Sequence, residues 1–291
     1  MSAFASAFFS VANPINVALS IAIVGVLGVG MTAVILTGGI DLSVGSGVAL
    51  VGIATALAAH AGGSLPALAA GILLGGLGGA FVGLLVARWR VPSFLVTLAT
   101  LSIYRGLAYW ISGGRSIGEF PPGLTWLGQG ILLGLPVPVW VMLLVFALGW
   151  FVLTRTTGGR WVYATGGNEQ AAWLAGVDTQ RVVFATYLAN GLLVGLAGVM
   201  LAARLGAGVP NAGVGYELDV IAAVVVGGTA LVGGRGGVIG TLIGAVFIGV
   251  LNNALNIANV DPYIQRIVVG VVILGAVLAD QVWRRILHTL R

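Results

Sequence analysis

The sequence predicts an all-α, polytopic membrane helical bundle that forms a single domain over residues 1–291. Hydrophobic residues make up 59% of the chain and charged residues 7%, and the mean hydropathy is +1.10. A soluble domain carries roughly 25% charged residues, so this chain has too few to cover its surface in water. Lipid must cover most of it. The 48 glycines follow no collagen-like period and predict Gly-rich breaks between the helices.

Nine apolar runs approach the length of about 20 residues that a helix needs to cross a bilayer. They extend over residues 15–36, 46–61, 66–87, 93–111, 131–153, 182–203, 218–232, 238–257 and 263–279. The second and seventh runs are short enough to be re-entrant or tilted segments.

The distribution of arginine predicts the orientation of these spans. All thirteen basic residues are arginine, and short cytoplasmic loops are enriched in basic residues. If nine spans alternate, the arginines after the third and fifth spans and at the C-terminus fall on one side, which is therefore the cytoplasm. Met1 then lies outside and the C-terminus inside. Arginines scattered at the ends of apolar runs indicate membrane topology rather than nucleic-acid binding.

The composition excludes several classes of chemistry. Without lysine there is no Walker-type phosphate loop and no Schiff base, and without cysteine there is no thiolate metal site. His60 and His288 fall at opposite ends of the membrane, so one chain cannot build a two-histidine metal site. No catalytic constellation is recognisable, and we expect neither enzymatic activity nor a cofactor.

The longest cytoplasmic loop, residues 154–181, predicts a short helix of its own. Residues 168–175 are good helix formers, Asn168 suits the N-cap, and Gly176 suits the C-cap. The alternative is an interfacial helix that only anchors the loop.

Two Gly-rich segments resemble each other, which suggests two related halves as in many transporters. The segment at 36–46 reads LTGGIDLSVGS, and the segment at 231–241 reads LVGGRGGVIGT. In the first, Asp41, Ser43 and Ser46 suit the capping of the helix that follows. Two interpretations stay open: cytoplasmic turns with a cap, or part of a gate or pathway.

Asn252, Asn253 and Asn256 form a polar stripe, because positions three and four apart share a helix face. Amides are costly in lipid, so this face is expected to point into the bundle. It could line a route for a neutral, hydrogen-bonding solute, or it could bond neighbouring helices.

A few other polar residues lie within or beside the spans. Arg105 and Asn190 are isolated polar residues within apolar runs. Glu217 and Asp219 begin the seventh run, and carboxylates in a first helical turn favour a capping interpretation. The spans lack the chained Asp, Glu or His residues of a proton relay, which argues against a proton-coupled carrier.

Three ordered motifs give the chain a family resemblance that runs from about residue 15 to residue 280. They read VILTGGIDLSVGS, GRWVYATGGNEQAAWLAGV, and PNAGVGYELDVIAAVVVGGTALVGGRGGVIGTLIGAVFIGVLNNALNIANVDPYIQRIVVG. Together they resemble the ribose-type permease family of bacterial ABC sugar importers. The resemblance implies an inner-membrane subunit that moves a monosaccharide (ribose-, xylose- or galactose-like), and that pairs with a second permease copy, identical or different.

The resemblance also implies partners and site residues. In an importer of this family, cytoplasmic ATP-binding subunits hydrolyse the ATP, and a periplasmic sugar-binding protein delivers the solute. The matching loop residues for coupling to the ATPase are Asn168, Glu169, Ala171, Ala172 and Gly176. The family pattern has ten spans, so our count of nine lacks one at the N-terminus.

We assign a pathway or gate role to Asp41, Ser43, Asn252, Asn253 and Asn256.

Other functions remain as alternatives. One is the permease of a related ABC importer for a nucleoside, a branched-chain amino acid or a signalling furanone. The IDLS and VLNNALN stretches favour the sugar branch by resemblance. Another is a self-sufficient channel or secondary carrier, against which the lack of an intramembrane acidic ion site argues.

Overall fold

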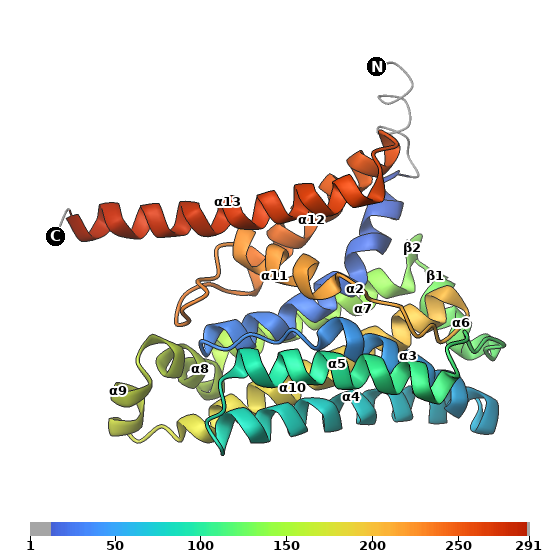
Figure 1. Cartoon of the computed structure of the whole chain (residues 1–291), viewed down its shortest axis with the longest axis horizontal. Coiled ribbons are helices and arrows are strands. Elements are labelled where there is room, and N and C mark those ends of the chain that lie inside the picture. The colour runs from blue at the N-terminus through green and yellow to red at the C-terminus, as the bar shows by residue number, and fades with distance from the viewer. Residues whose placement is uncertain (1–12, 290–291) are drawn as a thin grey trace.

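The computed structural model describes residues 13–289 as an almost entirely helical bundle, which confirms the predicted fold class (Figure 1). The elements are α2 (Asn13–Leu36), α3 (Val44–Gly62), α4 (Ser64–Ala87), α5 (Ser93–Ser112), α6 (Pro122–Gln129), β1 (Ile131–Leu132), β2 (Leu135–Pro136), α7 (Val137–Arg155), α8 (Thr157–Gly167), α9 (Glu169–Leu174), α10 (Thr179–Leu205), α11 (Tyr216–Val226), α12 (Val238–Ile257) and α13 (Pro262–Thr289). Residues 1–12 and 290–291 lie outside the described residues, and with them the predicted position of Met1.

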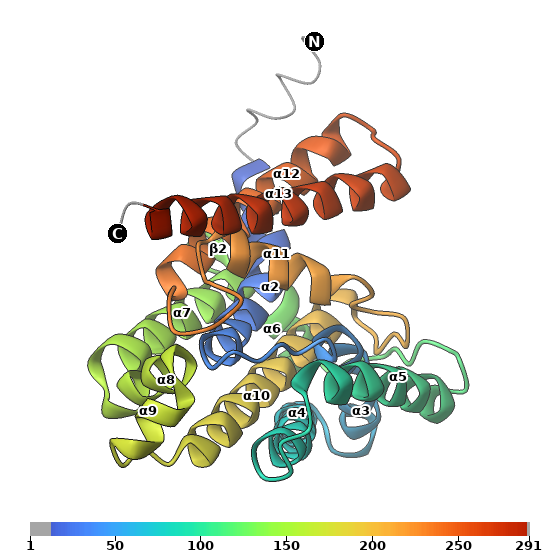
Figure 2. The same ribbon diagram turned by 60° about the vertical axis from the view of Figure 1, so that its left-hand side comes forward.

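Seven of the described helices are long and apolar enough to cross a membrane: α2, α3, α4, α5, α7, α10 and α12. They coincide with seven of the nine predicted runs. The ninth run falls in α13, whose apolar part, Pro262–Leu278, is shorter. In Figures 1 and 2, α12 and α13 lie on one side of the body and α4 and α5 on the other, with α2 between them.

The seventh predicted run is not a complete spanning helix. Its helix, α11, has 11 residues and is about 16 Å long at a rise of 1.5 Å per residue, whereas the bilayer core is about 30 Å thick. The re-entrant alternative fits this segment.

The prediction of a span starting at residue 131 is also wrong at its beginning. Residues 131–136 form a hairpin in which Ile131 pairs with Pro136 and Leu132 with Leu135. Leu133 (φ +51°) and Gly134 (φ +80°) make its two-residue turn, as positive-φ hairpin turns require. Proline near the first turn then starts α7 at Val137, because its fixed φ suits a helix N-terminus.

Helices α4 and α10 meet along a seam of glycines. A Cβ atom on Gly75 would overlap the backbone of Gly191 and Gly195, and one on Gly79 would overlap Tyr187 and Gly191. Small residues spaced four apart allow two membrane helices to approach this closely. The seam draws α10 into the centre, where it also packs on α2 and α3.

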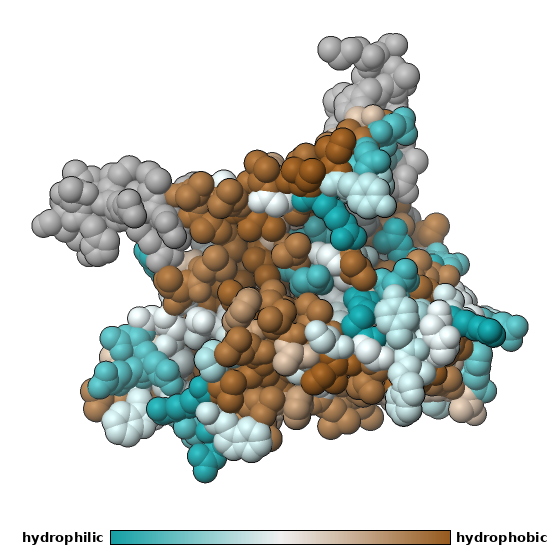
Figure 3. Space-filling view, in the orientation of Figure 1, coloured by the Kyte–Doolittle hydropathy of each residue, from teal (hydrophilic) through white to brown (hydrophobic). Residues whose placement is uncertain are grey.

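The outer surfaces of α4 and α5 are apolar. Leu73, Leu77 and Phe81 of α4 are exposed, as are Ile103 and Trp110 of α5, and Trp110 is 80% exposed. Brown side chains cover much of the face in Figure 3. Such large apolar patches are rare on soluble monomers and suit contact with lipid.

The two similar Gly-rich segments lie side by side. Gly38 (φ +82°) and Gly233 (φ +88°) occupy equivalent positions in the two segments and have similar positive φ angles. The Gly234 N–H donates to the Leu36 carbonyl at 2.9 Å. A glycine is required at Gly233 for a second reason, because a Cβ there would overlap the backbone at Gly38. The sequence similarity therefore corresponds to two matching turns that contact each other.

The connection between α10 and α11, residues 206–215, runs back along α3. Gly208 exchanges two backbone hydrogen bonds with Ile117, at 2.8 and 2.9 Å. A Cβ on Gly208 would contact Gly52, and one on Gly213 would contact Gly45. Since α3 rises about 10 Å between residues 45 and 52, the connection follows α3 into the bundle as irregular backbone.

Candidate functional site

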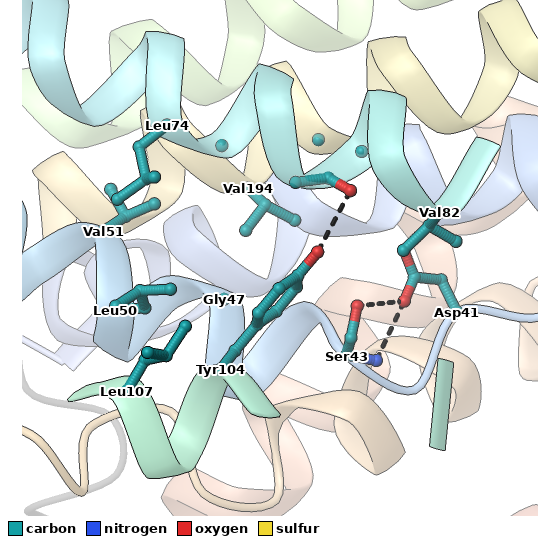
Figure 4. Close-up of a pocket in the computed structure, with 14 residues that line it drawn as sticks. Asp41, Ser43, Gly47, Leu50, Val51, Leu74, Val82, Tyr104, Leu107 and Val194 are labelled. Carbon is teal, nitrogen blue, oxygen red and sulfur yellow. Dashed lines mark hydrogen bonds between the residues drawn. The ribbon is translucent and has the colours of Figure 1, made fainter. Parts of the chain in front are cut away.

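Asp41 is the centre of a buried polar network in the connection between α2 and α3. It is 3% exposed. Its Oδ1 accepts hydrogen bonds from the Ser43 N–H at 2.8 Å and the Ser43 hydroxyl at 2.6 Å (Figure 4). Its Oδ2 accepts one from Asn190 Nδ2 at 2.8 Å. Asp41 and Ser43 lie where α3 begins, but the predicted capping is wrong: Asp41 bonds to Ser43 itself, and Ser43, at the N-cap position, makes no side-chain cap hydrogen bond. Ser46 does not cap the helix either, because its hydroxyl donates to the Ser43 carbonyl.

The irregular backbone next to Asp41 is satisfied by α5 and α10. The Ile40 N–H donates to Ser93 Oγ at 3.3 Å, and the Ile40 carbonyl accepts from Thr97 at 3.3 Å and Tyr187 at 3.4 Å. Non-helical backbone within a membrane bundle requires such partners. The connection is thus held by two helices that lie far from it in sequence.

A cavity of about 140 Å³ opens beside Asp41, between α3, α4, α5 and α10. Asp41 and Ser43 lie at one end, and Leu50, Leu74 and Leu107 at the other (Figure 4). Tyr104 projects into it and donates to the Gly78 carbonyl at 3.0 Å. The predicted residues Asp41 and Ser43 are therefore brought together at the polar end of an otherwise apolar cavity.

The predicted asparagine stripe lies elsewhere. Helix α12 packs on α2, α7, α11 and α13, and not on the helices that line the cavity beside Asp41. Asn252 and Asn253 are half-buried, and Asn253 Oδ1 has no partner within the part of the chain that the structure describes. Asn256 is exposed and accepts a hydrogen bond from Gln265 at 3.0 Å. The expectation that the whole stripe points into the bundle is wrong for Asn256.

The loop at 154–181 contains two helices, not one. The predicted helix is confirmed as α9: Asn168 Oδ1 accepts the Ala171 N–H at 2.9 Å as its N-cap, and Gly176 follows at φ +88°. Helix α8 was not predicted. Its signal is Thr156, whose hydroxyl accepts the Gly159 N–H at 3.2 Å and was not recognised as an N-cap.

The residues predicted to couple to a partner differ in accessibility. Asn168, Glu169, Ala171 and Gly176 are exposed, but Ala172 is 5% exposed and packs inward. The same short helix exposes two large apolar side chains that the sequence analysis did not select, Trp173 at 65% and Leu174 at 73%.

Helix α8 rests on the paired Gly-rich turns. The Tyr163 hydroxyl donates to the Gly236 carbonyl at 3.0 Å, and burial raises the pKa of this phenol, which keeps it a neutral donor. A Cβ on Gly166 would overlap the Leu36 carbonyl. Figure 1 shows α8 and α9 at one end of the bundle and the β1–β2 hairpin at the opposite end.

Long apolar helices, buried irregular connections between them and a short helix that exposes Trp173 and Leu174 at one end define a polytopic membrane protein. Comparison with known proteins gives the family. Residues 13–277 match the family described as branched-chain amino acid transport system / permease component, and the chain belongs to it.

The similar proteins are sugar permeases. Ribose import permease protein RbsC of Escherichia coli (strain K12) is 45% identical over 278 residues, covering 94% of this chain and 87% of the relative. RbsC of Bacillus subtilis (strain 168) is 44% identical over 282 residues, covering 94% and 86%. The D-allose transport system permease protein AlsC of E. coli (strain K12) is 38% identical over 276 residues, covering 94% and 85%. No solved structure matches significantly. The chain is thus a permease subunit of the ABC sugar importers, a multi-pass protein of the inner membrane.

Proposed function

We propose that this chain carries a monosaccharide of the ribose, allose or arabinose kind inward across the inner membrane, driven by ATP hydrolysis in cytoplasmic subunits that dock on α9. A periplasmic sugar-binding protein delivers the solute, and two permease copies form the membrane unit. The names of the similar proteins support the sugar class, since they record ribose, D-allose and L-arabinose. The exposed apolar surface of α9 is the observation that carries the docking assignment.

The shape of α9 suits a docking element. Trp173 and Leu174 are exposed on a helix of six residues, where they gain nothing from the core of their own chain. Burying a side chain of this kind contributes about 1.5 to 3 kcal/mol, so covering both favours a complex. The caps at Asn168 and Gly176 fix the helix, and inward-packed Ala172 anchors it.

One route connects α9 to the interior through α10. Glu169 Oε1 accepts a hydrogen bond from the Thr179 hydroxyl at 3.1 Å, where α10 begins. Farther along α10, Asn190 holds Asp41. A displacement of α9 would therefore move α10 and strain the Asn190–Asp41 contact, which supports a gate role for Asp41 and Ser43.

The asparagine stripe of α12 is proposed to line the pathway. Asn253 Oδ1 is buried within the chain and has no partner among the described residues. A buried amide oxygen is costly unless it is satisfied, which supports water in the pathway as its partner. With the arginines placed on the cytoplasmic side, the C-terminus is proposed to be cytoplasmic as well.

Transport of sugar is tested with the chain reconstituted in liposomes together with its ATP-binding subunits and binding protein. Labelled ribose, allose and L-arabinose are compared with leucine as an amino-acid control. We expect ATP-dependent uptake of at least one sugar and none of leucine. Uptake of leucine alone would overturn the sugar assignment.

Docking is tested by a double variant, Trp173→Ala with Leu174→Ala. Trp89→Ala is a matched control, because Trp89 is 66% exposed in the turn after α4 and lies outside α9. The double variant is expected to reach the membrane at the normal level but to lose co-purification of the ATP-binding subunit, which the control retains. Equal recovery with both variants would refute the role of α9.

A further inference from the structure

The connection that precedes α11 places charged groups in the middle of the bundle. Arg105 lies twelve residues after Ser93, where α5 begins, and seven before Ser112, where it ends. At 1.5 Å per residue it is about 18 Å from one end of this spanning helix and about 10 Å from the other. Its Nη1 donates to the carbonyls of Pro210 and Ala212, both at 2.8 Å. The irregular segment therefore sits at membrane depth.

Four charged residues gather where this segment turns into α11, and we call them the charge cluster: Arg105, Glu217, Asp219 and Arg266. The Glu217 carboxylate lies against Gly45 at the start of α3, beside the Gly213 carbonyl, because a Cβ on Gly45 would overlap both. Asp219 lies in the same first turn of α11. The Arg266 guanidinium carbon lies 4.0 Å from the position that a Cβ on Gly215 would take. The two positive and two negative charges balance.

The members of the charge cluster are close but unpaired. The described part of the chain contains one salt bridge, between Arg181 and Asp178, and it lies outside the cluster. Arg105 has donor capacity to spare, because its hydrogen bonds to other described residues involve Nη1 alone. Charged groups at this depth face a water-filled space or a partner, because lipid cannot solvate them. Figure 3 shows hydrophilic side chains gathered between the brown surfaces around α11.

We propose that the charge cluster is an intramembrane binding site for the sugar in transit. Sugar hydroxyl groups would donate hydrogen bonds to Glu217 and Asp219 and accept them from Arg105 and Arg266. A balanced set of donors and acceptors suits a neutral polyol, and charge-assisted bonds of this kind are stronger than neutral ones. The proposal rests on the proposed sugar import and adds the place at which the permease itself contacts the solute.

The first test exploits the absence of cysteine from the chain. Leu218 is 52% exposed and lies between the two carboxylates, so Leu218→Cys reports on the cluster without removing a charge. Ile103→Cys is the control, because Ile103 is 50% exposed on the apolar surface of α5. Both variants are assembled into the full importer and treated with a membrane-impermeant, water-soluble thiol reagent, with and without the transported sugar during ATP turnover.

We expect Leu218→Cys to react and the sugar to slow its reaction fivefold or more, while Ile103→Cys stays unreactive. A Leu218→Cys that does not react, or that reacts equally with and without sugar, would overturn the proposal. Uptake by the same preparations separates the two hypotheses. If sugar is transported but does not slow the reaction of Leu218→Cys, only the proposed binding site is refuted. If the unmodified importer takes up no sugar, the proposed function itself is refuted.

A charge substitution provides the second test. Glu217→Gln keeps the size of the side chain and removes its charge. With saturating binding protein, we expect maximal sugar uptake to fall tenfold or more and the uptake ratio of sugar to its deoxy analogue to change, while the assembled importer is recovered at the wild-type level. Loss of assembly, or an equal loss for sugar and deoxy analogue, would indicate a structural role and refute the assignment.

Discussion

Replacing Gly75 with alanine tests whether the seam between α4 and α10 sets the packing of the bundle. The added Cβ would overlap the backbone of Gly191 and Gly195, and backbone cannot rotate out of the way. Carbon contacts are optimal at about 3.5 to 4.0 Å, so the two helices must separate by about 1 Å along the seam. Overpacking of this kind costs about 1 to 3 kcal/mol.

Gly106→Ala is the matched control, because Gly106 is also helical but a Cβ there meets nothing within 4 Å. Alanine stabilises a helix interior by about 0.5 to 1 kcal/mol in both variants, so this contribution cancels in the comparison. At about 2 to 4 °C per kcal/mol, Gly75→Ala should unfold about 2 to 12 °C below Gly106→Ala. Tryptophan fluorescence during heating in detergent measures both. A Gly75→Ala midpoint at or above the control would refute the seam argument.

Three further predictions concern the connections. Gly233→Ala should lower the unfolding temperature more than Gly228→Ala: both residues have positive φ, at about +88° and +87°, but only the Cβ on Gly233 would overlap neighbouring backbone. Asn168→Ala should destabilise α9 by about 1 kcal/mol and speed amide exchange at Ala171, whereas aspartate at 168 should retain protection. Asp41→Ala should lower the free energy of unfolding by about 1 to 3 kcal/mol, because buried donors lose their acceptor. An unchanged midpoint of thermal unfolding would contradict the role of this network.

The long helices could be predicted because their information is local. The run at 238–257 coincides with α12, and the arginines that bound other runs lie next to helix ends. The cap residues around α9 are similarly local, since Asn168 bonds to a backbone group three residues away. Hydrophobicity and short-range capping were therefore sufficient to predict where these helices lie.

The depth of the α10–α11 connection could not be predicted, because its partners are distant in sequence. Residues 206–215 contain the Gly, Pro and Asn expected of a loop outside the membrane, yet Arg105 and Ile117 hold them along α3. The capping interpretation of Glu217 and Asp219 remains compatible with their place in the first turn of α11. Their depth adds a cluster with arginine that no local pattern contains.

Side-chain direction was equally inaccessible in the short helix α9. Transfer of coupling residues from the family motif selected Ala172, which packs inward, and omitted the neighbouring Trp173 and Leu174, which are exposed. A helix of six residues is too short for periodicity to fix its buried face. The asparagines of α12 failed in part for a related reason: a shared face can be predicted from spacing, but the helix against which it packs cannot.

The irregular segment before α11 has a consequence for membrane insertion during synthesis. Its backbone cannot enter lipid as an independent helix, so it needs partners already in the bilayer. Those partners, Arg105 on α5, Ile117, and Gly45 and Gly52 on α3, all precede it in the chain. The ribosome therefore delivers the scaffold before the segment that depends on it, and the order of elements along the gene matches the order in which the bundle can be assembled.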